Sequence, residues 1–192
     1  MKKWMPWLIV AAILVVLIVS VFTSYNSLVN AEENVNQSYS QIQNQLQRRT
    51  DLIPNLVNTV KGYASHEKAV IDDVSKARAQ LAGAKTPGDQ AAANDRLDSA
   101  LSRLLVVVEK YPDLKANQQY TQLMDELAGT ENRLAVARQD YNSAVATYNK
   151  KVKRMPGALI AGLFGFEEKE YFKADESAKK TPKVDFGDSS DQ

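Results

Sequence analysis

An uncharged stretch near the N-terminus constrains the fold more than any other feature of this chain. It runs for 19 residues, from Trp4 to Phe22, without an Asp, Glu, Lys or Arg. As a helix, such a segment is roughly 28 Å long, about the thickness of the hydrocarbon core of a bilayer. Trp4, Trp7 and Tyr25 lie at its ends, where amphipathic rings favour the headgroup region. The sequence therefore predicts a membrane-spanning helix, and we expect residues 1–24 to form an anchor.

A removable signal peptide is the other reading of such an N-terminus. The apolar core of a signal peptide usually has roughly 7–15 residues and is followed by small residues at a cleavage site. The run in this chain is longer, and the sequence from Ser20 to Tyr25 lacks the small-residue pattern. The absence of cysteine also excludes a lipid-modified N-terminal cysteine. We therefore expect the span to stay on the protein.

Basic residues on either side of the span predict its orientation. Lys2 and Lys3 precede the span, whereas the next basic residue after it is Arg48. Lysine and arginine close to the end of a span favour the cytoplasmic side of the membrane. We expect a single-pass protein with its N-terminus in the cytoplasm and its body outside.

The charges of the chain argue against a nucleic-acid partner. Lys and Arg total 24 and Asp and Glu total 23, so the chain has almost no excess of positive charge with which to neutralise phosphates. The sequence contains no cysteine, which excludes disulfides and thiolate metal ligands. We therefore expect no nucleic-acid binding.

The body of the chain has the apolar spacing of long helices that pack at a shallow angle. Apolar residues recur in alternating steps of three and four, the seven-residue pattern of helical bundles. The first stripe consists of Leu28, Ala31, Val35, Tyr39, Ile42, Leu46, Ile53, Leu56, Val60 and Tyr63, with Arg49 in its one polar position. Further stripes are Val70, Val74, Ala77 and Leu81, then Leu97, Leu101, Leu104, Val108 and Tyr111, then Ala116, Tyr120, Leu123, Leu127, Thr130, Leu134, Ala137, Tyr141, Ala144 and Tyr148. The predicted fold class is all-α: an N-terminal transmembrane helix followed by a long antiparallel helical bundle of about four helices over residues 25–154.

Proline and threonine predict where these helices begin and break. Pro54 lies inside the first stripe, and because proline removes one backbone hydrogen bond we expect a kink or an interruption there. Thr86 and Pro87 can cap and begin the third helix, and Tyr111-Pro112 breaks it at its end. Residues 23–27 contain no strong helix stop, so the first helix of the body can continue directly from the span.

The chain changes character after the fourth stripe. Residues 156–166 are apolar and uncharged, and these 11 residues are too few to span a bilayer. We expect residues 155–172 to form an apolar Gly/Phe segment that packs on the bundle; contact with the membrane interface or with a neighbouring copy is the alternative. Lys, Asp, Ser and Pro dominate residues 173–192 and no apolar period survives there, so we expect a disordered tail.

No catalytic, cofactor or metal site is predicted. His66-Glu67 begins like the H-E-x-x-H zinc motif, but the fifth position is Val70. Gly83 and Gly88 have the spacing of a phosphate-binding loop, but Asp89 stands where that loop needs lysine. Both motifs are therefore rejected, and we expect the protein not to be an enzyme.

Two basic clusters and one row of tyrosines allow more than one interpretation. We interpret Arg48-Arg49 as part of a solvated face and residues 150–154 as cations at a helix end, with an anionic lipid or an acidic partner surface as the alternative. Tyr120, Tyr141 and Tyr148 share one helix face. We interpret them as core residues with their hydroxyls at the rim, and a ligand-stacking platform is the alternative.

Three blocks of residues resemble the LemA family of bacterial membrane proteins. The first block is Tyr25-Asn26-Ser27-Leu28-Val29. The second runs from Arg48 to Val57 and continues through Val60-Lys61-Gly62-Tyr63-Ala64 and His66-Glu67. The third contains Ala137-Arg138, Tyr141-Asn142, Tyr148-Asn149, Pro156-Gly157 and Ala161-Gly162-Leu163-Phe164-Gly165-Phe166. The resemblance covers nearly everything from Tyr25 to Phe172, with one departure at Tyr39, where the family typically carries Trp.

The resemblance implies a long antiparallel bundle behind an N-terminal membrane helix, in the cytoplasmic (inner) membrane of a bacterium. It transfers no catalytic residue. The residues that it marks as structural or interaction candidates are Arg48, Arg49, Asp51, Pro54, Asn55, His66, Glu67, Tyr141, Asn142, Tyr148, Asn149, Pro156, Gly165 and Phe166. Because a buried charge needs a partner, we also expect Arg49 to pair with Asp140 or Glu131 across the bundle.

These expectations combine into one function and one alternative. The first is a non-enzymatic, membrane-anchored helical scaffold or adaptor that self-associates or organises other membrane proteins. The alternative is an assembly that shapes or stabilises the membrane by acting directly on lipid. The expected partners are the lipid bilayer, further copies of the chain and a membrane protein such as a membrane protease, with no cofactor.

Overall fold

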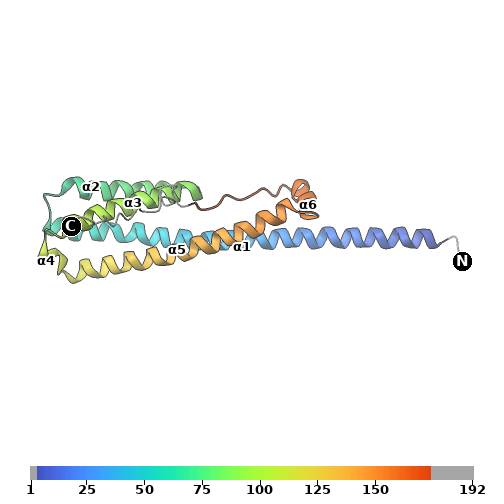
Figure 1. Ribbon diagram of the computed structural model, residues 1–192, viewed down its shortest axis with the longest axis horizontal. Coiled ribbons are helices and arrows are strands. Elements are labelled where there is room, and N and C mark those ends of the chain that lie inside the picture. Colours follow the sequence, from blue (N-terminus) through green and yellow to red (C-terminus); the bar gives the residue numbers. More distant parts are fainter. Residues whose placement is uncertain (1–3, 174–192) are drawn as a thin grey trace, which may run out of the picture.

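One helix forms the axis of the structure. In the computed structural model, which describes residues 4–173, α1 runs without a break from Met5 to Tyr63, over 59 residues. At 1.5 Å per residue it is about 90 Å long. Its N-terminal part extends alone beyond the bundle, and its C-terminal part is packed against the other helices (Figure 1). The expected continuity between span and body is therefore confirmed.

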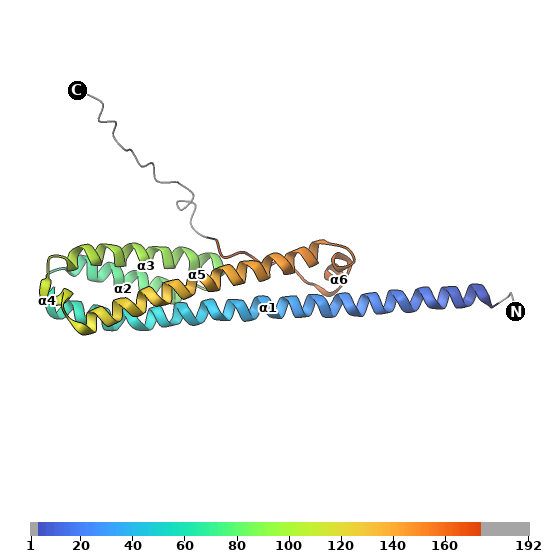
Figure 2. The ribbon, with the colours of Figure 1, turned by 60° about the horizontal axis from the view of Figure 1, so that its bottom comes forward.

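A second long helix returns along the first. α5 runs from Gln118 to Lys153 and packs antiparallel to α1. In the sequence between α1 and α5, α2 (Lys68–Gly83) and α3 (Pro87–Val108) form a hairpin. Figure 2 shows that this hairpin lies beside the C-terminal part of α1, far from the apolar run. The short α4 (Pro112–Lys115) joins α3 to α5. Residues 4–173 contain helices and no strands, so the predicted all-α class is confirmed.

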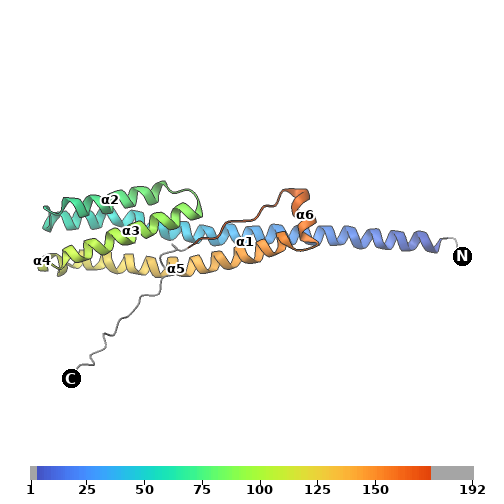
Figure 3. The same cartoon turned by 45° about the horizontal axis from the view of Figure 1, so that its top comes forward.

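The bundle has four helices over only part of its length. The hydroxyl of Tyr39 lies 3.1 Å from the Oε1 atom of Gln90, at the start of α3, so the α2–α3 hairpin begins beside the middle of α1. From there to the distal tip, which we define as the end that carries α4, α1, α2, α3 and α5 run together (Figure 3). At the opposite end of the bundle, which we call the proximal end, α1 and α5 are joined by α6 (Gly157–Phe164) and by residues 166–173.

The buried side chains follow most of the predicted stripes. Leu28, Ile42, Leu56 and Val60 of α1 are at most 1% exposed. The buried stripe of α1 ends one residue later than predicted, because Tyr63 is exposed and Ala64 is buried. Further along, Ile71 is buried rather than Val70 and Val145 rather than Ala144. In these two cases burial moves by one residue along the helix. Tyr39, Tyr111 and Leu123 are only partly buried, and the predicted position Ala116 is wrong, because this residue follows α4 and is exposed.

Pro54 does not interrupt α1, so of the two outcomes expected there, a kink or an interruption, the interruption is wrong. Proline at position 54 removes the donor that would bond the carbonyl oxygen of Thr50 in the helix. The Nε atom of Arg78 in α2 donates to that oxygen at 2.8 Å. A side chain from the neighbouring helix therefore replaces the missing backbone bond.

The predicted helix start at Thr86 is confirmed. The Oγ1 atom of Thr86 accepts a hydrogen bond of 3.1 Å from the backbone N–H of Asp89, and Pro87 is the first residue of α3. The expected break at Tyr111-Pro112 is present between α3 and α4. The expected disordered tail lies outside the described residues apart from Lys173.

Candidate functional site

A buried arginine holds three helices together in the distal half. Arg49 of α1 is only 2% exposed, and its guanidinium donates to Asn94 and Asp98 of α3 and to Glu131 of α5. Asn94, itself buried, also donates to Asp98 at 2.9 Å. The predicted pair with Glu131 is confirmed. Asp140, the other candidate, is exposed near the proximal half of α5 and does not pair with Arg49.

Three other candidate residues near Arg49 lie on solvated parts of α1. Arg48 is exposed and forms an ion pair of 2.7 Å with Glu126 of α5. Asp51 is exposed and accepts a hydrogen bond from Gln47. Asn55 is also exposed. Of the candidate residues in α1, only Arg49 lies in the core, so its interpretation as part of a solvated face is wrong.

His66 and Glu67 lie in the connection between α1 and α2, at the distal tip. His66 is exposed. Glu67 accepts a hydrogen bond of 3.2 Å from the hydroxyl of Tyr111, the residue before α4. This contact, together with burial, raises the pKa of Tyr111, with burial the larger cause. Glu67 therefore ties the α1–α2 connection to the α3–α4 connection.

A tight turn carries the chain from α5 into α6. Pro156 precedes α6, and Gly157 begins it. A Cβ atom on Gly157 would lie 2.2 Å from the carbonyl oxygen of Lys151, so only glycine fits there. Gly165 ends the helix with a φ of 76°, in the left-handed region that glycine adopts without strain. Two glycines therefore fix the ends of α6.

α6 lies against α1 where the apolar run ends. Ile160 and Ala161 pack on Leu28, and the ring of Tyr25 lies between Phe164 and Phe166, with centroids 4.9 and 5.8 Å away. In the structure, α6 therefore packs against α1 and α5. Its outer face remains apolar and exposed, with Leu159 64%, Leu163 74% and Phe164 53% accessible to solvent.

Two asparagines of α5 hold the extended segment after α6. Asn149 donates to the carbonyl oxygen of Lys169 and accepts from its N–H, both at 2.9 Å. Asn142 makes the same pair of bonds to Phe172, at 3.0 and 2.9 Å. Each side-chain amide thus bonds one backbone residue as a neighbouring strand would. We refer to residues 166–173 as the strap.

The tyrosines of α5 are core residues, as predicted. The hydroxyl of Tyr141 donates to the carbonyl oxygen of Glu170 in the strap at 2.8 Å, and burial, with smaller contributions from Tyr39 and Glu170, raises its pKa to about 12. Burial also raises the pKa values of Tyr120 and Tyr148. Their hydroxyls are buried without a hydrogen-bond partner among the described residues, so the expected rim position is wrong for these two.

Basic residues at the end of α5 line a hollow beside α1. This hollow, about 420 Å³ in volume, is bounded by Thr23, Ser24, Ser27 and Leu28 of α1 and by Thr147, Lys150, Lys151, Arg154, Met155, Pro156 and Gly157. The Nζ atom of Lys151 donates to the hydroxyl of Ser27 at 2.8 Å and to its carbonyl oxygen at 3.2 Å. We call this feature the proximal hollow.

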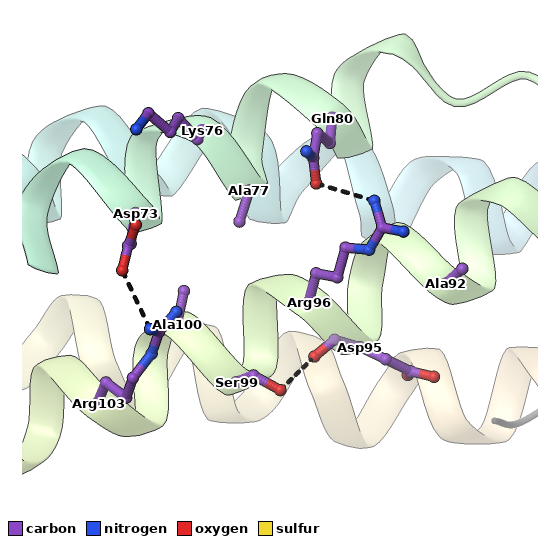
Figure 4. A pocket seen from close by; sticks show the side chains of 10 residues that line it. All are labelled: Asp73, Lys76, Ala77, Gln80, Ala92, Asp95, Arg96, Ser99, Ala100 and Arg103. Carbon is purple, nitrogen blue, oxygen red and sulfur yellow. Dashed lines mark hydrogen bonds and ion pairs between the residues drawn. The ribbon is translucent and has the colours of Figure 1, made fainter. Parts of the chain in front are cut away.

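A second hollow lies on the outer face of the α2–α3 hairpin (Figure 4). Its volume is about 460 Å³, and Ala77 and Ala100 are among its lining residues. Asp73 pairs with Arg103 across it at 3.1 Å, and Arg96 donates to Gln80 at 3.3 Å. These polar residues bridge the two helices, which suits hairpin packing more than the binding of a small molecule.

Residues 4–173 bring no three or more His, Asp or Glu side chains together in a way that could hold a metal ion. Sequence reasoning missed Asn94, Asp98 and Arg78, whose partners include residues on other helices. It also missed the need for glycine at position 157. Of the candidates, Tyr141, Asn142, Tyr148, Asn149, Pro156, Gly165 and Phe166 meet near the strap and α6, and the others lie in the distal half.

α1 is long and apolar enough to cross a membrane, and it is the one such helix in residues 4–173. From Trp7 to Val19 its side chains are exposed, with no protein around them. The structure and composition therefore support a membrane-associated helical protein with one N-terminal candidate span.

Comparison with known proteins identifies the family. The LemA family model matches residues 38–186, which include most of the bundle, α6 and the strap. Magnetosome protein MamQ 2 of Paramagnetospirillum magneticum is 29% identical over 88% of this chain and 71% of its own length. Magnetosome protein MamQ of Magnetospirillum gryphiswaldense is 27% identical over 83% of this chain and 68% of its own. Protein LemA of Metamycoplasma hominis is 23% identical over 66% of this chain and 58% of its own. The chain belongs to the LemA family.

Proposed function

We propose that this protein is a non-enzymatic, membrane-anchored helical scaffold that self-associates or organises other membrane proteins. The observation that carries the proposal is the unbroken α1, which joins a candidate span to a bundle without a flexible linker. A bundle attached in this way is held at a fixed distance from the bilayer and in a fixed rotation about the span. Such an arrangement suits the presentation of a surface more than the turnover of a substrate.

The interior of the bundle supports the same proposal. Arg49 contacts partners from two other helices, and a buried charge with specific partners disfavours every register in which those partners are lost. The relatives named magnetosome proteins carry the name of a cellular structure rather than of a reaction, which supports a structural role. We place the protein in the cytoplasmic membrane of a bacterium, with its N-terminus inside and its body outside.

Exposed apolar side chains on the bundle are candidate contact points. Val106 of α3 is 68% exposed and Val136 of α5 is 58% exposed, both beyond the apolar run of α1. Val136 also lines a hollow of about 600 Å³ between α1 and α5, with Gln41 and Gln45. Large apolar groups exposed on a polar bundle favour contact with another copy or with a partner protein.

The first experiment is extraction of the tagged full-length protein in mild detergent, with mass determination and identification of every co-purifying protein. A large complex of this chain alone assigns self-assembly. A stoichiometric membrane protein, for example a membrane protease, assigns an adaptor role. The double variant Val106→Ser, Val136→Ser is expected to reduce the amount of the complex. The control is Ala128→Ser, at an exposed position of α5. A monomer without a partner contradicts the proposal.

A second candidate function, membrane shaping, is favoured by the outer face of α6. Leu159, Leu163 and Phe164 are exposed beside Tyr25, next to the end of the span. In this alternative, assembled copies act on lipid through that face. Reconstitution of full-length protein into liposomes, followed by imaging of vesicle shape, tests it: Leu163→Ser is expected to abolish any remodelling, whereas Leu105→Ser on α3 is not. Vesicles of unchanged shape count against this candidate.

A further inference from the structure

We propose that the proximal hollow binds the phosphate-bearing headgroup of an anionic phospholipid. This inference rests on one part of the proposed function, that α1 crosses a bilayer, and it is independent of whether the protein is a scaffold. It applies to either orientation of the span, because the hollow is defined by its depth relative to the apolar run.

The depth of the hollow matches the headgroup layer. Thr23, Ser24 and Ser27 follow Phe22 by one, two and five residues. Along a helix these residues lie about 1.5–8 Å beyond the end of the apolar run. A bilayer has a hydrocarbon core of about 30 Å within a total thickness of about 40–45 Å, so each headgroup layer is roughly 5–8 Å deep. The hydroxyls on the α1 side of the hollow therefore lie at the level of lipid phosphates.

The charge of the hollow suits an anion. Lys150, Lys151 and Arg154 line it, and among residues 4–173 none of them forms an ion pair. Nearby cations differ, since Lys153 pairs with Glu168 at 2.7 Å and Lys169 with Glu32 at 2.6 Å. Lys153 and the strap residue Lys169 are thus neutralised, whereas the three cations at the hollow have no carboxylate partner among residues 4–173. Basic pockets at this depth bind anionic lipid headgroups.

One of these cations is held in position. Lys151 is partly buried, and its two hydrogen bonds to Ser27 fix its ammonium group against α1. An ammonium group has three donors, so one remains for a ligand oxygen. The exposed side chains of Lys150 and Arg154 can then close on the same phosphate from the α5 side. Together these three basic side chains form an anion site in which one cation is already held in position.

The surroundings of the hollow also suit acyl chains. Two apolar residues line it: Leu28, which is buried, and Met155, which is 68% exposed. The exposed apolar face of α6 lies beside α1 at the same level. A free phosphate ion gains nothing from such surfaces, whereas a phospholipid places its glycerol and upper acyl chains against them. This argument favours a lipid over a soluble anion.

Cations at the end of α5 have a competing explanation, since they also stabilise the negative end of the helix dipole. That role needs no hollow and predicts no preference among lipids. The two explanations therefore differ in lipid selectivity, which can be measured without reference to stability.

The test uses full-length protein in nanodiscs that contain phosphatidylglycerol and phosphatidylcholine in equal amounts. Native mass spectrometry after release counts the lipids of each kind that remain bound. We expect preferential retention of phosphatidylglycerol by the natural chain. Each basic residue near an anionic surface changes binding about five-fold, so Lys150→Gln with Arg154→Gln is expected to reduce that preference about 30-fold.

The matched control is Lys61→Gln with Lys110→Gln. It removes the same charge from exposed positions at and near the distal tip, and it is expected to keep the full preference. Circular dichroism of every variant separates loss of binding from loss of helix.

Three outcomes overturn the proposal. They are equal retention of both lipids by the natural chain, an equal effect of the two double variants, and binding of inorganic phosphate in detergent with no lipid preference, which would assign the hollow to a soluble anion. Mild-detergent mass determination remains the separate test of the scaffold, so either proposal can fail alone.

Discussion

Pro54 and Arg78 act on the same backbone atom. Pro54 cannot donate to the carbonyl oxygen of Thr50, and the Nε atom of Arg78 donates to it at 2.8 Å. Thr50 is buried, so water is a poor substitute for either donor. The continuity of α1 at this point therefore depends on α2.

This relationship predicts a specific energetic coupling. Arg78→Leu leaves a buried carbonyl oxygen unpaired and is expected to lower the free energy of unfolding by about 1–3 kcal/mol. In a Pro54→Ala background, the alanine N–H can bond that oxygen, so the same change is expected to cost about 1 kcal/mol less. A double-mutant cycle by denaturant unfolding measures the difference. Arg96→Leu on the α3 surface is the control, and additive effects at positions 54 and 78 would contradict the coupling.

Adjacent arginines provide a second prediction. Arg49→Leu leaves Glu131 and Asp98 without their shared cation, and we expect a loss of about 2–3 kcal/mol, below the usual cost of breaking a fully buried pair because both carboxylates are more than a third exposed. Arg48→Leu breaks only an exposed pair with Glu126 and is expected to change stability by about 0.5 kcal/mol or less. Thermal unfolding compares the two. Equal losses of stability in the two variants would contradict a special contribution of the buried Arg49 to the bundle.

Two glycines of α6, Gly157 at its start and Gly162 in its interior, should respond to alanine in opposite directions. Gly157→Ala puts a Cβ atom against the carbonyl oxygen of Lys151 and is expected to cost about 1–3 kcal/mol. Gly162→Ala has nothing within 4 Å and should add about 0.5–1 kcal/mol, since alanine is a better helix former. The midpoint of thermal unfolding reports both. A stabilising effect at position 157 would mean that the α5–α6 turn is not as close as described.

Tyr141 makes attachment of the strap dependent on pH. Its pKa is about 12 in the folded protein against 10.0 ordinarily, so its contribution is complete below pH 10 and is lost as the pH rises towards 12. The ionised oxygen also cannot donate to Glu170. We expect Tyr141→Phe to be less stable than the natural chain by about 1 kcal/mol at pH 9, to match it between about pH 10 and 11, and to be the more stable of the two near pH 12. Denaturant unfolding across this range measures the difference in stability between the two proteins. A difference that does not change with pH would contradict the role given to ionisation of Tyr141.

The features that the sequence predicted are those encoded locally. The stripes of α1 and α5, the threonine cap at Thr86 and the break at Pro112 each depend on residues within about one or two helical turns. Contacts between helices were harder. The Arg49–Glu131 pair was predicted because a charge in an apolar stripe requires a partner, but nothing local distinguishes Asn94 and Asp98 as its other ligands.

The same limit explains the errors. A proline inside a helix looks like a break until a donor on another helix is known, and Arg78 lies 24 residues further along the chain. The resemblance marked Asn142 and Asn149, but their bonds to the strap have no signature in spacing. The hollow beside Ser27 combines residues that are 124 positions apart, so no sequence window contains both sides.

The continuous α1 makes the protein a lever. About 41 residues, or roughly 60 Å of helix, separate Phe22 from Tyr63 at the distal tip. A span that tilts by about 20° in its bilayer would swing that tip sideways by roughly 20 Å. Changes in bilayer thickness, which alter tilt, are thereby converted into displacement far from the lipid, and whatever is bound at the tip moves with the membrane.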